Sequence, residues 1–97
     1  MSTSNETGTV RIRVIYTGHV QGVCFRITTV DISGGRSVTG FVRNIPDGTV
    51  ELEAEGERRE VEEFLVAIER YFAANLRDVQ RVSLKPRGDE STFEITY

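Results

Sequence analysis

Apolar and polar residues alternate along this 97-residue chain in short runs, and the order of the runs leaves room for few folds. The runs at 10–17 and 50–55 have the period of two that is typical of half-buried strands, and 38–45 is a further strand candidate. Between the last two, Pro46-Asp47-Gly48 predicts a hairpin turn, because proline presets φ and glycine accepts a positive φ. The glutamates at 51, 53 and 55 would then form the solvent face of their strand.

A second pattern, with apolar residues three or four positions apart, predicts a helix over 57–73. Glutamates gather near the start of this segment, where negative charge stabilises a helix. We interpret its apolar side as core rather than as a partner-binding face. Two further strands are expected at 79–84 and 93–97, joined by a turn at 88–91.

The stretch between 27 and 39 has the length of a crossover helix but a poor composition for one. It is rich in β-branched residues and contains Gly34-Gly35, and each glycine costs about 1 kcal/mol relative to alanine inside a helix. We therefore predict a short helix of poor intrinsic stability that ends near Ser33.

The resulting order, βαββαβ plus a short C-terminal strand, is typical of the ferredoxin-like α+β fold, a split βαβ arrangement. It predicts one antiparallel sheet with two helices on one face. Residues 1–8 are expected to be a disordered lead-in, and residues 9–97 a single domain. Because the first two strands would run parallel, their carboxyl ends should lie at the same edge of the sheet.

Composition excludes several classes of function. A single cysteine, Cys24, allows no internal disulfide, and with His19 as the one histidine no cluster of metal ligands is expected. A net charge of −3 gives no general attraction to nucleic acid or to acidic membranes. Without an apolar targeting or membrane-spanning run we expect a cytoplasmic protein. No feature indicates an obligate interface, so we expect a monomer.

The segment Gly18-His19-Val20-Gln21-Gly22-Val23-Cys24-Phe25-Arg26 follows the first predicted strand. A glycine-rich turn after a strand lets consecutive backbone N–H groups point into one concavity that can hold an anion. Arg26 adds a planar, permanently charged fork that matches phosphate oxygens. The segment therefore predicts a local anion cradle, and Asn44, at the end of the second strand, should face it.

This segment resembles the first signature of the acylphosphatases. Gly40-Phe41-Val42-Arg43-Asn44, followed by Gly48, Val50 and Gly56, resembles the second, and the thirteen-residue gap between Arg26 and Gly40 also matches. The resemblance covers about Val10 to Tyr97. The chain departs from the family pattern in the first helix and at its end, where it has Ser33 and Arg36-Ser37-Val38.

The resemblance implies hydrolysis of the carboxyl-phosphate bond of small-molecule acyl phosphates, without a metal or cofactor. It assigns Arg26 to gripping the phosphoryl group and Asn44 to orienting the attacking water. Phosphate, or sulfate as its mimic, would bind the same loop. The backbone that would wrap the phosphate oxygens is that of Gln21, Gly22, Val23, Cys24, Phe25 and Arg26.

Other interpretations of these residues stay open. Cys24 could suggest a covalent phosphatase, but that loop needs five residues between its cysteine and arginine, and here only Phe25 intervenes; a buried packing role is favoured. His19 is interpreted as a loop residue without chemistry. The whole domain could instead be a noncatalytic anion-binding module. An RNA-binding module is disfavoured, because the strand at 50–55 offers three glutamates where aromatic and basic residues are needed.

Overall fold

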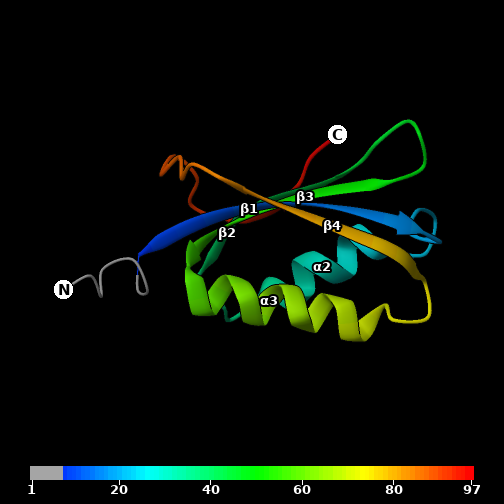
Figure 1. Ribbon diagram of the computed structural model, residues 1–97, viewed down its shortest axis with the longest axis horizontal. Helices are drawn as coiled ribbons and strands as arrows, with labels where there is room; N and C mark the ends of the chain where they lie inside the picture. The colour runs from blue at the N-terminus through cyan, green and yellow to red at the C-terminus, as the bar shows by residue number, and fades with distance from the viewer. Residues whose placement is uncertain (1–7) are drawn as a thin grey trace.

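The computed structural model describes residues 8–97, whose helices and strands follow the expected order (Figure 1). The expected disordered lead-in, residues 1–8, lies outside the described residues except for Gly8. The elements are β1 (Thr9–Gly18), α2 (Phe25–Ser33), β2 (Val38–Asn44), β3 (Val50–Glu57), α3 (Arg58–Tyr71), β4 (Leu76–Leu84) and β5 (Phe93–Ile95).

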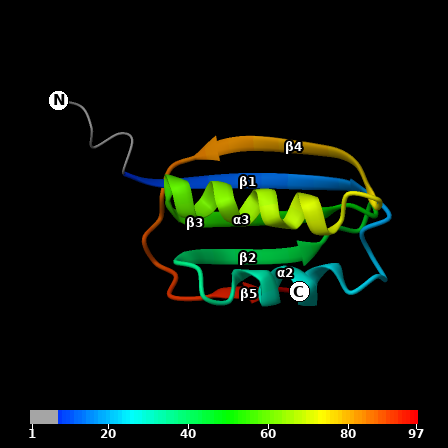
Figure 2. The same ribbon diagram turned by 90° about the horizontal axis from the view of Figure 1, so that it is seen from below.

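The strands form a five-stranded sheet in the order β4-β1-β3-β2-β5 (Figure 2). β1 and β2 both pair antiparallel with β3, so they run parallel to each other on either side of it. This confirms the ferredoxin-like α+β fold and the placement of both carboxyl ends at one edge. The expected antiparallel sheet is mixed at its border, because β5 pairs parallel with β2.

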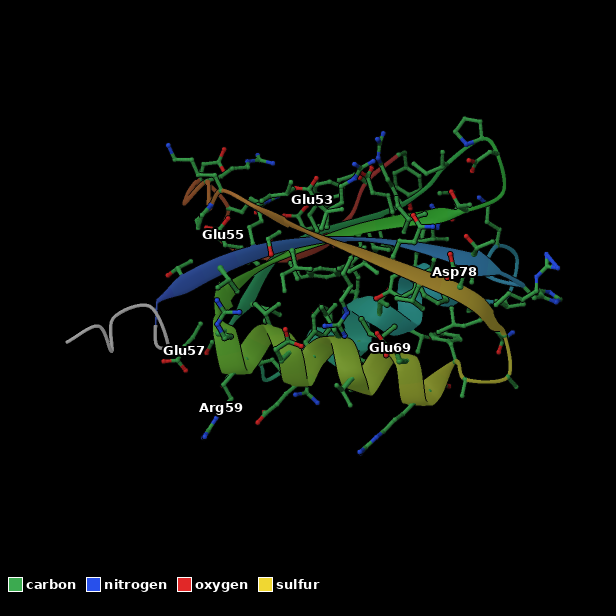
Figure 3. The ribbon with its side chains drawn as sticks, in the orientation of Figure 1. Glu53, Glu55, Glu57, Arg59, Glu69 and Asp78 are labelled. Carbon is green, nitrogen blue, oxygen red and sulfur yellow. The ribbon has the colours of Figure 1, made fainter. Side chains whose placement is uncertain are left out.

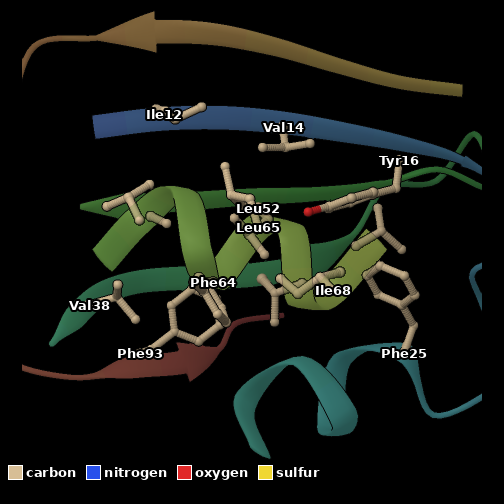
Figure 4. Packing of buried hydrophobic residues seen from close by; sticks show 14 of the residues in the cluster. Ile12, Val14, Tyr16, Phe25, Val38, Leu52, Phe64, Leu65, Ile68 and Phe93 are labelled. Carbon is tan, nitrogen blue, oxygen red and sulfur yellow. The ribbon is translucent and has the colours of Figure 1, made fainter. Parts of the chain in front are cut away.

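Both helices cover one face of the sheet, and the core lies between the two layers (Figures 1 and 4). The apolar side of α3 is core, as predicted, while Arg58 and Arg59 are exposed. The predicted weak helix is present as α2, which begins at Phe25 rather than Ile27 and ends at Ser33. It buries only Phe25 and Thr29, whose hydroxyl donates to the Phe25 carbonyl oxygen at 2.8 Å. Its poor intrinsic stability stays a prediction.

The glutamates of β3 lie on the side of the sheet away from the helices, where Figure 3 labels Glu53 and Glu55. They do not form the expected solvent face. That interpretation is wrong for Glu51 and Glu55, which are both buried. The physical reason is that the antiparallel register places arginines beside them. Arg11, only 1% exposed, donates from Nε to Glu53 at 2.6 Å and from Nη1 to Glu55 at 2.8 Å. Glu51 is bound by Arg13 and Arg43.

The connection between β4 and β5 differs from the expected turn at 88–91. These strands lie at opposite borders of the sheet, so residues 85–92 must cross from one border to the other. The crossing segment is held on the open face: Glu55 accepts from the backbone N–H groups of Arg87 and Gly88, each at 2.9 Å, and Glu90 binds Arg11 at 2.7 Å. Arg11 and Glu55 are therefore the anchor of this connection.

Burial by itself would raise the pKa of Glu55. The hydrogen bonds from the Arg87 N–H, from Arg11 and from the Gly88 N–H outweigh it and hold the pKa below its ordinary value. Burial likewise acts to raise the pKa of Glu51, and Arg43 and Arg13 lower it overall. Both carboxylates are thus charged and paired at neutral pH.

We expect Arg11→Met to lower the free energy of unfolding at neutral pH by about 3 kcal/mol, because it leaves buried carboxylates without their partner. Since the pKa of Glu55 is depressed in the folded state, its pairing stabilises the fold above the unfolded pKa of about 4.3. That stabilisation is lost as the pH falls through the folded pKa. The difference between the variant and the wild type should therefore shrink in acid.

Urea unfolding of both proteins at neutral and at acidic pH measures this difference. The matched control is Arg77→Met, which removes an exposed guanidinium from β4 and should change stability by less than about 0.5 kcal/mol. Equal stability of wild type and Arg11→Met at neutral pH would contradict the proposed anchor.

Candidate active site

The chain leaves β1 through a close contact that only glycine permits. Gly18 has φ of 138°, and a Cβ there would lie 2.3 Å from the carbonyl oxygen of Asn75. The next residue, His19, is exposed, donates its backbone N–H to that same oxygen at 2.9 Å and accepts from the Asn75 side chain. The loop therefore starts at a point fixed by the segment that enters β4.

The loop after this point is concave because its backbone alternates in handedness. Gly22 and Cys24 have positive φ angles of 77° and 62°. Such conformations turn successive N–H groups toward a common point, as in other anion-binding nests. The first backbone bond of α2 runs from Thr28 N to Cys24 O at 2.9 Å, so the N–H groups of 25–27 take no part in the helical ladder. They can serve an anion at the helix N-terminus.

A pocket of about 280 Å³ opens beside this loop and brings Arg26 and Asn44 together. Gln21 and Val23, which were expected in the same loop, do not line it. Val23 packs against the core, and the Gln21 side chain reaches the turn after β2. The lining residues are Val20, Gly22, Cys24, Phe25, Arg26, Ile27 and Asn44.

Asn44, the last residue of β2, carries an unusual amide. Within residues 8–97, its Oδ1 and the Tyr16 hydroxyl are the buried side-chain polar atoms that have no hydrogen-bond partner. Leaving a buried acceptor unsatisfied costs about 1–3 kcal/mol. An acceptor kept free at this cost, in a pocket with an arginine, is suited to binding a ligand or a water molecule.

Arg26 stands on the first turn of α2 and is half-buried. In the part of the chain that the structure describes, it forms no ion pair with a carboxylate. Its Cζ lies 5.2 Å from the centroid of the Tyr97 ring, a cation–π contact that the sequence did not indicate. The guanidinium charge is therefore available to an anion in the pocket.

Cys24 was predicted to be a buried packing residue, and this is wrong, because its thiol is exposed. The left-handed backbone at Cys24 directs the chain so that the next residue, Phe25, enters the core instead. The Phe25 ring packs 5.1 Å from the ring of Tyr16 and 4.3 Å from that of Phe72 (Figure 4). Phe25 thus fixes the end of the loop to the core.

Other surface features lie away from this pocket. A larger hollow of about 410 Å³ borders α3 and contains Arg36, Arg70 and two glutamates, with neither Arg26 nor Asn44 among its lining residues. Within residues 8–97, no group of three or more His, Cys, Asp or Glu side chains is placed to hold a metal ion. Neither helix described here is both long and apolar enough to cross a membrane.

Comparison with known proteins decides the family. The acylphosphatase family model matches residues 12–95, which is most of the chain. The chain belongs to the acylphosphatase family. An acylphosphatase of Anaeromyxobacter dehalogenans is 41% identical over 93 residues, which cover 91% of this chain and 96% of the relative. One of Anaeromyxobacter sp. strain Fw109-5 is 45% identical over 92 residues.

Solved acylphosphatase structures share the fold. The crystal structure of acylphosphatase from Bacillus subtilis superposes with a TM-score of 0.80 at 28% identity, covering 91% of this chain and 99% of that one. An acylphosphatase structure from Coxiella burnetii gives a TM-score of 0.75 at 26% identity over 99% of this chain. The chain is therefore an enzyme of the acylphosphatase family, whose reaction class is the hydrolysis of acyl phosphates.

The left-handed backbone at Cys24 gives a test of the loop geometry. Cys24→Val should lower the free energy of unfolding by about 2 kcal/mol, because a β-branched residue tolerates a positive φ poorly. Cys24→Gly should change it by less than about 1 kcal/mol, because relief of strain offsets the greater freedom of the unfolded chain. Urea unfolding compares the two variants. If Cys24→Val were more stable than Cys24→Gly, that result would contradict the positive φ at this position.

Proposed function

We propose that residues 9–97 form one catalytic domain that cleaves the carboxyl-phosphate bond of acyl phosphates with Arg26 and Asn44 as its catalytic residues. The observation that carries the proposal is that Arg26 and Asn44 line one pocket, while within residues 8–97 the Oδ1 of Asn44 is buried and has no hydrogen-bond partner. A guanidinium for the phosphoryl oxygens and a free acceptor for water are the two groups that this hydrolysis needs.

In this mechanism the phosphoryl group lies in the loop at the start of α2. The loop residues that line the pocket, Gly22, Cys24, Phe25 and Arg26, supply backbone N–H groups to its oxygens, and the Arg26 guanidinium binds them through paired N–H groups. Phosphoryl transfer passes through a loose transition state, so positioning and charge stabilisation supply most of the catalysis. Inorganic phosphate, the product, would occupy the same place, and sulfate would imitate it.

Asn44 supplies the position of the nucleophile. Its Oδ1 accepts a hydrogen bond from a water molecule and holds that water in line with the scissile bond. The water oxygen bonds to phosphorus while the bond from phosphorus to the acyl oxygen breaks, and the carboxylate leaves with the electron pair. A carboxylate is a stable anion, so no general acid is required. The proton of the water passes to an oxygen of the substrate's own phosphate.

The catalytic roles are tested by Arg26→Ala and Asn44→Ala in an assay of phosphate release from an acyl phosphate with EDTA present. Removal of Arg26 should lower kcat by roughly 10³-fold or more, because the transferring oxygens lose their charge partner. Removal of Asn44 should lower it by about 100-fold, because the water is no longer held in line.

The matched control for charge is Arg59→Ala, an exposed position on α3 that is labelled in Figure 3 and should keep wild-type activity. Circular dichroism checks that each variant is folded. An inactive wild type would favour the noncatalytic anion-binding module. Unchanged activity of folded Arg26→Ala would reject the proposed cradle.

The proton transfer gives a prediction of its own. The value of kcat/KM should fall as the pH drops through the second pKa of the substrate's phosphate, because the protonated oxygen no longer accepts the proton of the water. Steady-state rates across the neutral and acidic range measure this, with circular dichroism at each pH to exclude unfolding. A rate that stays high well below that pKa would point to a different proton acceptor.

A further inference from the structure

The side chain of Gln21 joins the two halves of the pocket. Its Nε2 donates one hydrogen bond to the carbonyl oxygen of Ile45 at 2.9 Å and a second to that of Thr49 at 2.8 Å. Gln21 belongs to the loop after β1, whereas Ile45 and Thr49 belong to the turn between β2 and β3. In the part of the chain that the structure describes, no other hydrogen bond links residues 19–27 to residues 44–49.

The turn that Gln21 holds is compact. Ile45 N donates to Thr49 O at 2.9 Å, and Gly48 N donates to Ile45 O at 3.0 Å. The Asp47 carboxylate accepts from both the backbone N–H and the hydroxyl of Thr49, at 2.9 and 2.6 Å. A turn closed by this many hydrogen bonds moves as one rigid segment. The two bonds from Gln21 to its carbonyl groups therefore hold the whole turn in place.

Asn44 comes immediately before this turn and shares a peptide bond with Ile45. Within residues 8–97 the Oδ1 of Asn44 has no hydrogen-bond partner, so no bond of that atom holds the amide in place. Its position relative to the loop depends on the backbone that carries it. That backbone is tied to the loop through the Ile45 carbonyl and the Gln21 amide.

We propose that Gln21 is a positioning residue, which sets the distance between the phosphate-holding loop and the Asn44 amide. The inference rests on the proposed function of Asn44. Gln21 acts on the reaction through Asn44, because its side chain does not line the pocket and both of its Nε2 hydrogens are used on the turn. A small displacement of a water-orienting group costs a large share of the rate.

Two substitutions separate shape from hydrogen bonding. Gln21→Met keeps nearly the same length but offers no N–H donor, and Gln21→Glu keeps the shape but sets acceptor oxygens against two carbonyl oxygens. Both should lower kcat by about 10- to 100-fold. In Gln21→Met, which adds no charge, KM and inhibition by inorganic phosphate should change little, because Arg26 and the loop N–H groups remain.

The matched control is Gln80→Met, which makes the same chemical change on β4. There the Gln80 amide is exposed, and among residues 8–97 its side chain bonds to Asp78 alone, at 3.0 Å. This variant should keep wild-type kcat. Because both variants replace one glutamine by one methionine, the comparison separates the loss of the Gln21 hydrogen bonds from a general effect of introducing methionine.

A double-mutant cycle shows whether Gln21 acts through Asn44. In the Asn44→Ala background, Gln21→Met should cause no further loss of kcat, because the group it positions is gone. A merely structural role would lower kcat by the same factor in both backgrounds, and that result would overturn the proposal. So would a wild-type kcat for Gln21→Met, or a raised KM with unchanged kcat.

If the wild type is inactive, the proposed function fails. The positioning role of Gln21 can then still be tested by a measurement that needs no substrate. Amide hydrogen exchange of Gly48, whose N–H donates inside the turn, should be faster in Gln21→Met by about tenfold and unchanged in Gln80→Met. Unchanged exchange at Gly48 in Gln21→Met would overturn the positioning role.

Discussion

The position of β3 between β1 and β2 is the constraint on which the candidate site depends. Because β3 pairs antiparallel with both neighbours, β1 and β2 run in the same direction and end at the same border of the sheet. The loop after β1 leads into the first turn of α2, which carries Arg26, and the end of β2 carries Asn44. Two side chains eighteen positions apart therefore line one pocket, although β1 and β2 pair with β3 and not with each other.

The site keeps groups that a stable fold would normally satisfy. In the described part of the chain, the Asn44 Oδ1 has no hydrogen-bond partner, Cys24 has a left-handed backbone, and the N–H groups of 25–27 make no helical hydrogen bond. These features cost stability, and rigid surroundings have to maintain them. Phe25 supplies part of that rigidity from the core, and the buried Arg11 with its carboxylates stiffens the opposite face of the same sheet.

Sequence reasoning reached the fold because the patterns of β1, β3 and α3 are periodic and their turns have clear signals. It failed where a side chain's surroundings come from distant segments. Alternation assigned Glu55 to solvent, but it cannot reveal that Arg11 lies opposite or that residues 85–92 cross over both. It assigned Cys24 to the core by residue type, while the backbone angle there depends on the loop. The free Oδ1 of Asn44 and the bonds of Gln21 depend on three-dimensional contacts that no local pattern encodes.

Asparagine before a turn ordinarily uses its amide to bond to the backbone of that turn. Here the turn is closed by its own backbone and by Asp47, and Gln21 satisfies the two carbonyl groups on its side. The N–H groups at 48 and 49 are already accepted by the Ile45 carbonyl and the Asp47 carboxylate, so they do not bond to the Asn44 oxygen. With the turn already stabilised by other residues, the Asn44 oxygen stays without a hydrogen-bond partner within residues 8–97. The free acceptor and the crowded turn are therefore two consequences of one arrangement, in which structural and chemical roles fall to different side chains.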